Sequence, residues 1–120
     1  MHFSESLKKN QDFQKVYRKG RSFANRLLVM YILKNDLEKN RFGISVSKKV
    51  GNSVVRHRVT RLLRESYRLH EDVFNSGLDI VVIARAGAKE AKYSEIEKAL
   101  LHLGNLHHIV DFTKNEKKME

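Results

Sequence analysis

One segment in the middle of the chain carries basic side chains at the spacing of successive helical turns. The pattern predicts a helix over about residues 53–69, and at 100° per residue four side chains share an arc of roughly 60°: His57, Arg61, Arg64 and Arg68. An arginine presents a planar fork that matches two phosphate oxygens. Because stacked like charges repel and only Glu65 lies near enough to relieve them, the pattern favours a polyanionic partner over a solvated helix face.

The opposite side of this predicted helix is apolar. The residues expected to face the core are Val55, Val59, Leu62, Leu63, Ser66 and Leu69. Just before the helix, Lys48, Lys49 and Gly51 occupy a turn whose backbone amides could approach a phosphate at the helix N-terminus. A simple strand-to-helix turn would have the same composition, and no P-loop pattern occurs.

Positive charge is concentrated in the first 70 residues. The 120 residues include 24 Lys and Arg against 14 Asp and Glu, a formal net charge of +10. Residues 41–70 hold eight basic residues and one acidic residue, whereas residues 71–120 hold seven and nine. Such a field attracts polyanions, either nucleic acid or an anionic membrane. The chain has no cysteine, no apolar run of about 18 residues and no secretory-signal pattern, so we expect a cytoplasmic protein without a membrane partner.

The remaining periodicities predict a small α+β domain. Strands are expected at residues 22–25, 27–33, 42–47 and 78–84, and further helices at 10–20 and from 94 onward. The strands at 27–33 and 42–47 are expected to pair as a hairpin. This order describes an α/β sandwich in one domain over 1–120, with its core at about 8–110 and a frayed charged tail over 113–120.

Cap residues and apolar spacing define the ends and inner faces of the outer helices. Asn10 is expected to cap the first helix and Gly20 to end it, and Ser94 with Glu97 suggests a capping box for the last. The inner face of the last helix is expected to carry Ile96, Leu100, Leu103, Leu106 and the pair Ile109–Val110. On the first helix Phe13, Val16 and Tyr17 share a face, which fits core packing or, for the rings, stacking on unpaired bases.

No pattern of residues indicates a catalytic centre or a metal site within the protein. The six histidines show no His-x-x-x-His spacing. Metal-dependent phosphodiester cleavage needs clustered carboxylates, whereas five aspartates are spread over different predicted elements: Asp12, Asp36, Asp72, Asp79 and Asp111. We therefore expect no catalytic residue, no cofactor held by the protein and no small-molecule substrate.

Residues 45–65 resemble the signature of the protein subunit of bacterial ribonuclease P, and they read SVSKKVGNSVVRHRVTRLLRE. Supporting matches are KNQDF at 9–13, ANR at 24–26 and IVVIAR at 80–85, and the similarity covers residues 8–110. Two positions depart from the family pattern, since His57 stands where Asn is usual and Thr60 where Lys is usual.

The resemblance implies an αβββαβα fold with a small mixed four-stranded sheet and a left-handed βαβ crossover around the basic helix. It implies an endoribonuclease that works as a ribonucleoprotein, in which a catalytic RNA removes the 5′ leader of precursor tRNA with Mg²⁺ held through that RNA. The protein would bind the RNA subunit through Lys48, Lys49, Asn52, Arg56, His57, Arg58, Arg61, Arg64 and Arg68. The leader would lie in a cleft against Phe13, Tyr17 and Tyr31.

Two alternatives remain on the residues alone. One is another RNA- or DNA-binding module, such as a ribosomal type, although a helix-turn-helix would need a second short helix beside the basic one. The other is a stand-alone nuclease, against which the scattered carboxylates argue.

Overall fold

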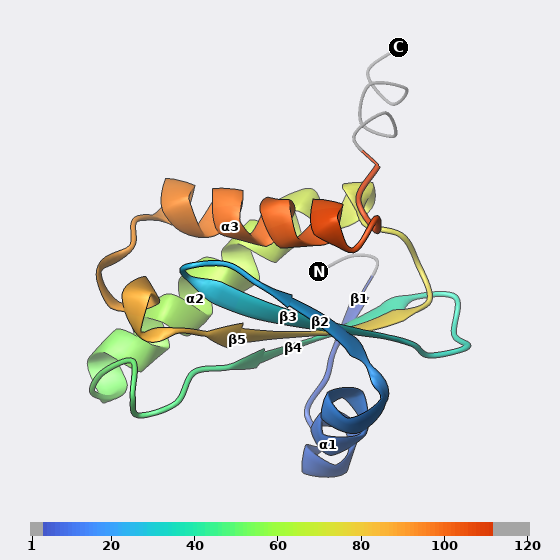
Figure 1. Cartoon of the computed structure of the whole chain (residues 1–120), viewed down its shortest axis with the longest axis horizontal. Helices are drawn as coiled ribbons and strands as arrows, with labels where there is room; N and C mark the ends of the chain where they lie inside the picture. The colour runs from blue at the N-terminus through green and yellow to red at the C-terminus, as the bar shows by residue number, and fades with distance from the viewer. Residues whose placement is uncertain (1–3, 112–120) are drawn as a thin grey trace.

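The computed structural model describes residues 4–111, which form a five-stranded sheet with helices on both faces. The elements in chain order are β1 (Ser4–Ser6), α1 (Asn10–Lys19), β2 (Arg21–Ala24), β3 (Leu28–Lys34), β4 (Asn40–Ser45), α2 (Ser53–His70), the 3-10 helix η1 (Glu71–Val73), β5 (Leu78–Ala84), the 3-10 helix η2 (Ala86–Glu90) and α3 (Tyr93–Leu106). Helices α2 and α3 cover one face of the sheet and α1 packs on the other (Figure 1). The predicted α+β class is confirmed.

Strand β5 occupies the centre of the sheet, whose order is β1-β4-β5-β3-β2. It pairs parallel with β4, to which α2 connects it, and antiparallel with β3. The predicted hairpin between residues 27–33 and 42–47 is therefore wrong, because β5 lies between those two strands. Ile80, Val81 and Val82 are fully buried. A strand that is apolar on both faces is stabilised most at the centre, where both faces are covered.

The sequence patterns missed β1. Its residues Ser-Glu-Ser carry no apolar alternation, yet they pair in parallel with the start of β4. A long-range contact helps to hold this strand, since the hydroxyl oxygens of Ser4 and Tyr67 lie 2.7 Å apart. The sheet consequently has five strands instead of the expected four.

Two separate apolar clusters hold the helices on the sheet. Val59, Leu63 and Tyr67 of α2 belong to the larger cluster, together with α3 and one face of β3, β4 and β5. The smaller cluster centres on Leu7, Val16 and Val81, with the α1 rings packed against it. Burying an aliphatic side chain stabilises a fold by about 1.5–3 kcal/mol. The larger cluster, on the sheet face that α2 and α3 cover, therefore contributes more to the stability of the fold than the cluster on the α1 side.

In the last turn of α2, the residue that faces the core differs from the predicted one. Leu69 is 52% exposed, contrary to the prediction, whereas Tyr67 is fully buried. Tyr67 continues the row of Val59 and Leu63 at four-residue spacing, and its ring stacks on Phe42 with centroids 4.0 Å apart. Because the Tyr67 side chain points into the core, Leu69, two residues further along the helix, faces outward.

The ends of α1 and α3 differ from prediction by about one residue. Lys9, and not Asn10, is the N-cap of α1, while Gly20 follows its last residue as expected. At the start of α3, Glu95 caps the helix, because its Oε1 accepts a hydrogen bond from the backbone N–H of the N-cap residue Lys92 at 3.0 Å. The predicted capping pair of Ser94 and Glu97 is therefore wrong. Helix α3 ends at Leu106, which is 37% exposed and not part of the buried inner face.

Candidate nucleic-acid interface

The basic stripe of α2, defined as His57, Arg61, Arg64 and Arg68, is exposed along its length. Its backbone is fixed from behind, because Val59 and Leu63 are fully buried against the sheet. The helix begins after Asn52, whose side-chain oxygen accepts from the Val55 N–H at 3.0 Å. A rigid helix therefore presents the stripe to solvent, as the sequence predicted.

One member of the stripe has an acidic partner. Arg68 donates to both carboxylate oxygens of Glu65, at 2.5 and 3.1 Å, and this pairing lowers the pKa of Glu65. Arg61 and Arg64 form no ion pair with any side chain of residues 4–111. The central part of the stripe thus keeps its full charge for a partner.

Arg58 lies beside the stripe and has protein partners. Its Nη2 donates to the Ala91 carbonyl at 2.8 Å, and its Nη1 approaches the Lys89 carbonyl at 3.4 Å. These carbonyls belong to η2 and the residue that follows it. Arg56 is also half-buried. These two arginines are therefore less available than the stripe, although the family resemblance groups them with it as RNA-binding residues.

The turn before α2 exposes two lysines around a buried anchor. Lys48 and Lys49 are exposed, whereas the next residue, Val50, which precedes Gly51, is buried. A Cβ on Gly51 would lie 2.8 Å from the Val55 side chain. Glycine is therefore required here for close packing on the first turn of α2, and its role does not depend on a phosphate.

A second candidate surface is a hollow of about 380 Å³ between α1 and β4, here called the aromatic hollow. It is lined by Lys8, Asn10, Phe13, Gln14, Tyr17, Ile44 and Ser45. The Phe13 ring reaches β4 because position 43 is glycine, where a Cβ would lie 2.7 Å from that ring. Apolar ring surface and polar side chains thus meet in one open depression.

The three predicted leader-contacting rings are adjacent but not equivalent. Phe13 and Tyr17 line the aromatic hollow, with ring centroids 6.3 Å apart. Tyr31, on β3, packs edge-on against Tyr17 at 5.1 Å and is not among the lining residues. Burial raises the pKa of Tyr17 despite a hydrogen bond with Ser45. The rings are half-buried, so they contribute to packing and still expose surface.

Arg41 joins β4 to the buried Asp79 of β5 and also approaches α1. Asp79 on β5 accepts two hydrogen bonds from Arg41 on β4, at 2.8 and 2.6 Å, and Arg41 also reaches Asp12 of α1 at 3.4 Å. Sequence reasoning treated Asp12 and Asp79 as unrelated. The signal was a single carboxylate within an apolar strand, since a buried charge requires a partner.

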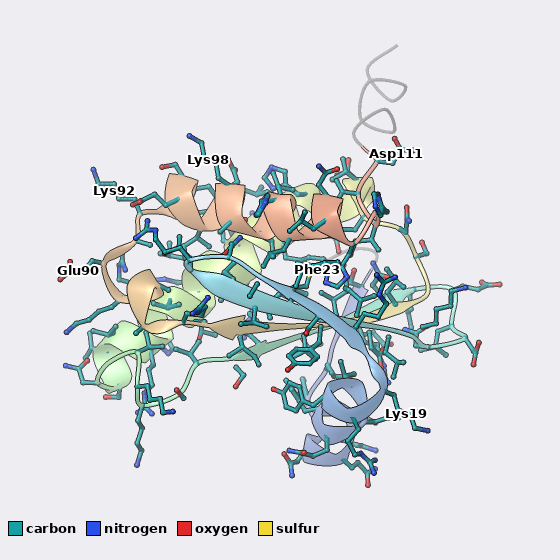
Figure 2. All side chains as sticks on the ribbon, viewed as in Figure 1. Lys19, Phe23, Glu90, Lys92, Lys98 and Asp111 are labelled. Carbon is teal, nitrogen blue, oxygen red and sulfur yellow. The ribbon has the colours of Figure 1, made fainter. Side chains whose placement is uncertain are left out.

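Neither a metal site nor a membrane span is found in the described part of the chain. Among residues 4–111, no three His, Asp or Glu side chains are placed to hold a metal ion together. No helix in that range is long and apolar enough to cross a bilayer. Figure 2 shows Lys92 and Lys98 extending from the α3 side, opposite α1.

An exposed cationic helix and a nearby hollow with aromatic walls are together typical of an RNA-binding protein. Comparison with known proteins identifies the group. The family model described as Ribonuclease P matches residues 1–107. The chain belongs to this family of ribonuclease P protein components.

Individual relatives agree with the family model. The ribonuclease P protein component of Lachnoclostridium phytofermentans is 61% identical over 114 residues, covering 95% of this chain and 98% of the relative. That of Clostridium acetobutylicum is 54% identical over 101 residues, covering 82% and 85%.

Solved structures show the same fold. The RNase P protein of Staphylococcus aureus superposes with a TM-score of 0.82 at 40% identity, covering 88% of this chain and 97% of that one. The RNase P protein from Thermotoga maritima gives a TM-score of 0.77 at 30% identity, covering 84% and 96%.

Proposed function

We propose that this chain binds the catalytic RNA subunit of ribonuclease P through α2 and the turn before it. The observation that carries the proposal is the stripe itself, in which Arg61 and Arg64 have no acidic partner among residues 4–111 while α2 is held rigidly by its buried side. Phosphates would supply the missing negative charge. The residues proposed to contact the RNA subunit directly are Lys48, Lys49, Asn52, His57, Arg61, Arg64 and Arg68, with Arg56 and Arg58 flanking them.

The 5′ leader of precursor tRNA is the proposed occupant of the aromatic hollow. Stacking of a base on an aromatic ring contributes about 1–3 kcal/mol and tolerates any base, which suits leaders of varied sequence. Phe13 and Tyr17 would provide the ring surface, and Tyr31 would support Tyr17 from the sheet.

Cleavage itself is assigned to the RNA subunit, which would also hold the Mg²⁺. Asp12 and Asp79 share one partner, Arg41, and among residues 4–111 they are not placed with a third acidic or histidine side chain to hold a metal ion. The protein would position substrate and relieve phosphate repulsion, and it would act in the cytoplasm.

Reconstitution tests this function directly. The chain is combined with a bacterial ribonuclease P RNA at low Mg²⁺, and cleavage of precursor tRNA is followed. We expect cleavage to be faster with the wild-type chain than with RNA alone, and the Arg61→Gln/Arg64→Gln variant to need a higher protein concentration. A wild-type chain that binds no RNA and stimulates no cleavage would contradict the proposal.

A further inference from the structure

The aromatic hollow adjoins a second, smaller hollow, which Arg64 of the basic stripe also lines. This second hollow, of about 140 Å³, lies where the end of β1 meets β4 and α2. Its walls include Lys8 after β1, Ile44 of β4, and Thr60 and Arg64 of α2. Lys8 and Ile44 line both hollows, so the two depressions adjoin at these side chains.

Lys8 is held in this position from both sides. The preceding residue, Leu7, is buried, and its N–H donates to the Phe42 carbonyl at 2.9 Å, which extends the pairing of β1 with β4. The following residue, Lys9, is the N-cap of α1, and its carbonyl accepts from the Phe13 N–H at 3.2 Å. The backbone of Lys8 is therefore fixed while its side chain is exposed.

Arg64 faces the same hollow from an equally fixed backbone. It follows the fully buried Leu63, and its own side chain is exposed. Neither Arg64 nor Lys8 forms an ion pair with another residue in the range 4–111. Two cations that border one depression repel each other, and an anion placed between them turns that repulsion into two attractive contacts.

We propose that Lys8 and Arg64 together hold one phosphate of the leader strand as it passes from the aromatic hollow toward α2. This inference rests on the proposed function and adds a specific site to it. Ile44 and the buried Leu7 and Phe42 form the apolar part of the wall, which fits the sugar beside that phosphate. The site makes Arg64 a contact for substrate as well as for the RNA subunit.

A double-mutant cycle tests whether the two side chains share a ligand. Lys8→Gln, Arg64→Gln and the double variant are assembled with the RNA subunit at saturating protein, and affinity for precursor tRNA and for mature tRNA is measured. If one phosphate is shared, each single variant weakens precursor binding. The double variant then departs from the product of the two losses by more than about threefold.

A matched cycle pairs Lys8→Gln with Arg61→Gln, because Arg61 lies on the same stripe but does not line this hollow. Its losses are expected to multiply within about twofold. The charge-retaining variants Lys8→Arg and Arg64→Lys should recover most precursor affinity, and unchanged circular dichroism shows that all variants fold.

Three results would overturn the proposal: losses at Lys8 and Arg64 that multiply like the matched pair, equal weakening of precursor and mature tRNA by Lys8→Gln, or coupling seen only in affinity for the RNA subunit. Failure of the broader function has a different signature. In that case the wild-type holoenzyme would bind precursor and mature tRNA equally.

Discussion

Arg58 and Arg61 lie three residues apart on α2, yet the structure predicts opposite consequences of replacing them. Arg61 is exposed and has no ion pair among residues 4–111, so its charge is available to a phosphate. Losing one phosphate contact should reduce the slope of log affinity against log salt by about 0.9. Raising the salt concentration from 50 to 200 mM should therefore weaken RNA-subunit binding by the Arg61→Gln variant about 3.5-fold less than it weakens binding by the wild-type chain.

Arg58→Gln should act mainly on stability. The variant loses the 2.8 Å bond to the Ala91 carbonyl, whereas the 3.4 Å approach to Lys89 is too long to contribute much. A bond from a charged donor contributes about 1.5–3 kcal/mol, and partial exposure here reduces the expected loss to about 1 kcal/mol. For a domain of this size that lowers Tm by about 4 °C.

The assay measures RNA-subunit affinity at several salt concentrations alongside thermal unfolding for both variants. The expected result is a smaller salt slope with little change in Tm for Arg61→Gln, and the reverse for Arg58→Gln. A slope reduced equally by both substitutions, with Tm unchanged in Arg58→Gln, would refute the distinction between the two arginines.

Three further predictions concern the rings and the core. Phe13→Ala or Tyr17→Ala should weaken binding of precursor tRNA about fivefold or more while mature tRNA is unaffected, because one base loses its stacking partner; equal losses on both substrates would show that the rings serve only the fold. Tyr67→Phe removes the hydroxyl that meets Ser4 at 2.7 Å and should lower the free energy of unfolding by about 1 kcal/mol, measured by urea titration; an unchanged midpoint would show that this contact does not stabilise β1. Burial lowers the pKa of His107, so the folded state disfavours its protonation, and Tm should fall as pH drops below about 6.5. That component should be missing in His107→Gln, and an identical pH profile for both proteins would contradict the assignment.

Local patterns predicted most of the elements because each depends on neighbouring residues. The 3.6-residue period located α2 within one residue at its C-terminal end, and the apolar run 78–84 matches β5. The basic stripe was predictable for the same reason, since its spacing along one helix determines its geometry. Glu65 as the neighbour that relieves it was also predicted correctly.

Contacts between distant segments were not predictable from these patterns. The pairing of Ser4 with Tyr67, which helps to hold β1, spans 63 residues and involves two hydroxyl groups without a periodic signal. The Arg41–Asp79 pair and the placement of β5 between β3 and β4 depend equally on tertiary packing. The proposed role of Lys8 follows from β1, so it could be formulated only once that strand was seen.

The central position of β5 also bears on how the chain reaches its native state. Of the five strands it is made last by the ribosome, yet it is the only one that joins the β1–β4 pair to the β2–β3 pair. A nascent chain that ends before residue 78 lacks the strand between β4 and β3, so the edges that these two strands turn toward β5 have no partner and can associate with another chain. Joining them requires contacts between segments far apart in sequence, a step that slows folding. We expect this protein to complete its sheet only late in synthesis, when residues 78–84 become available.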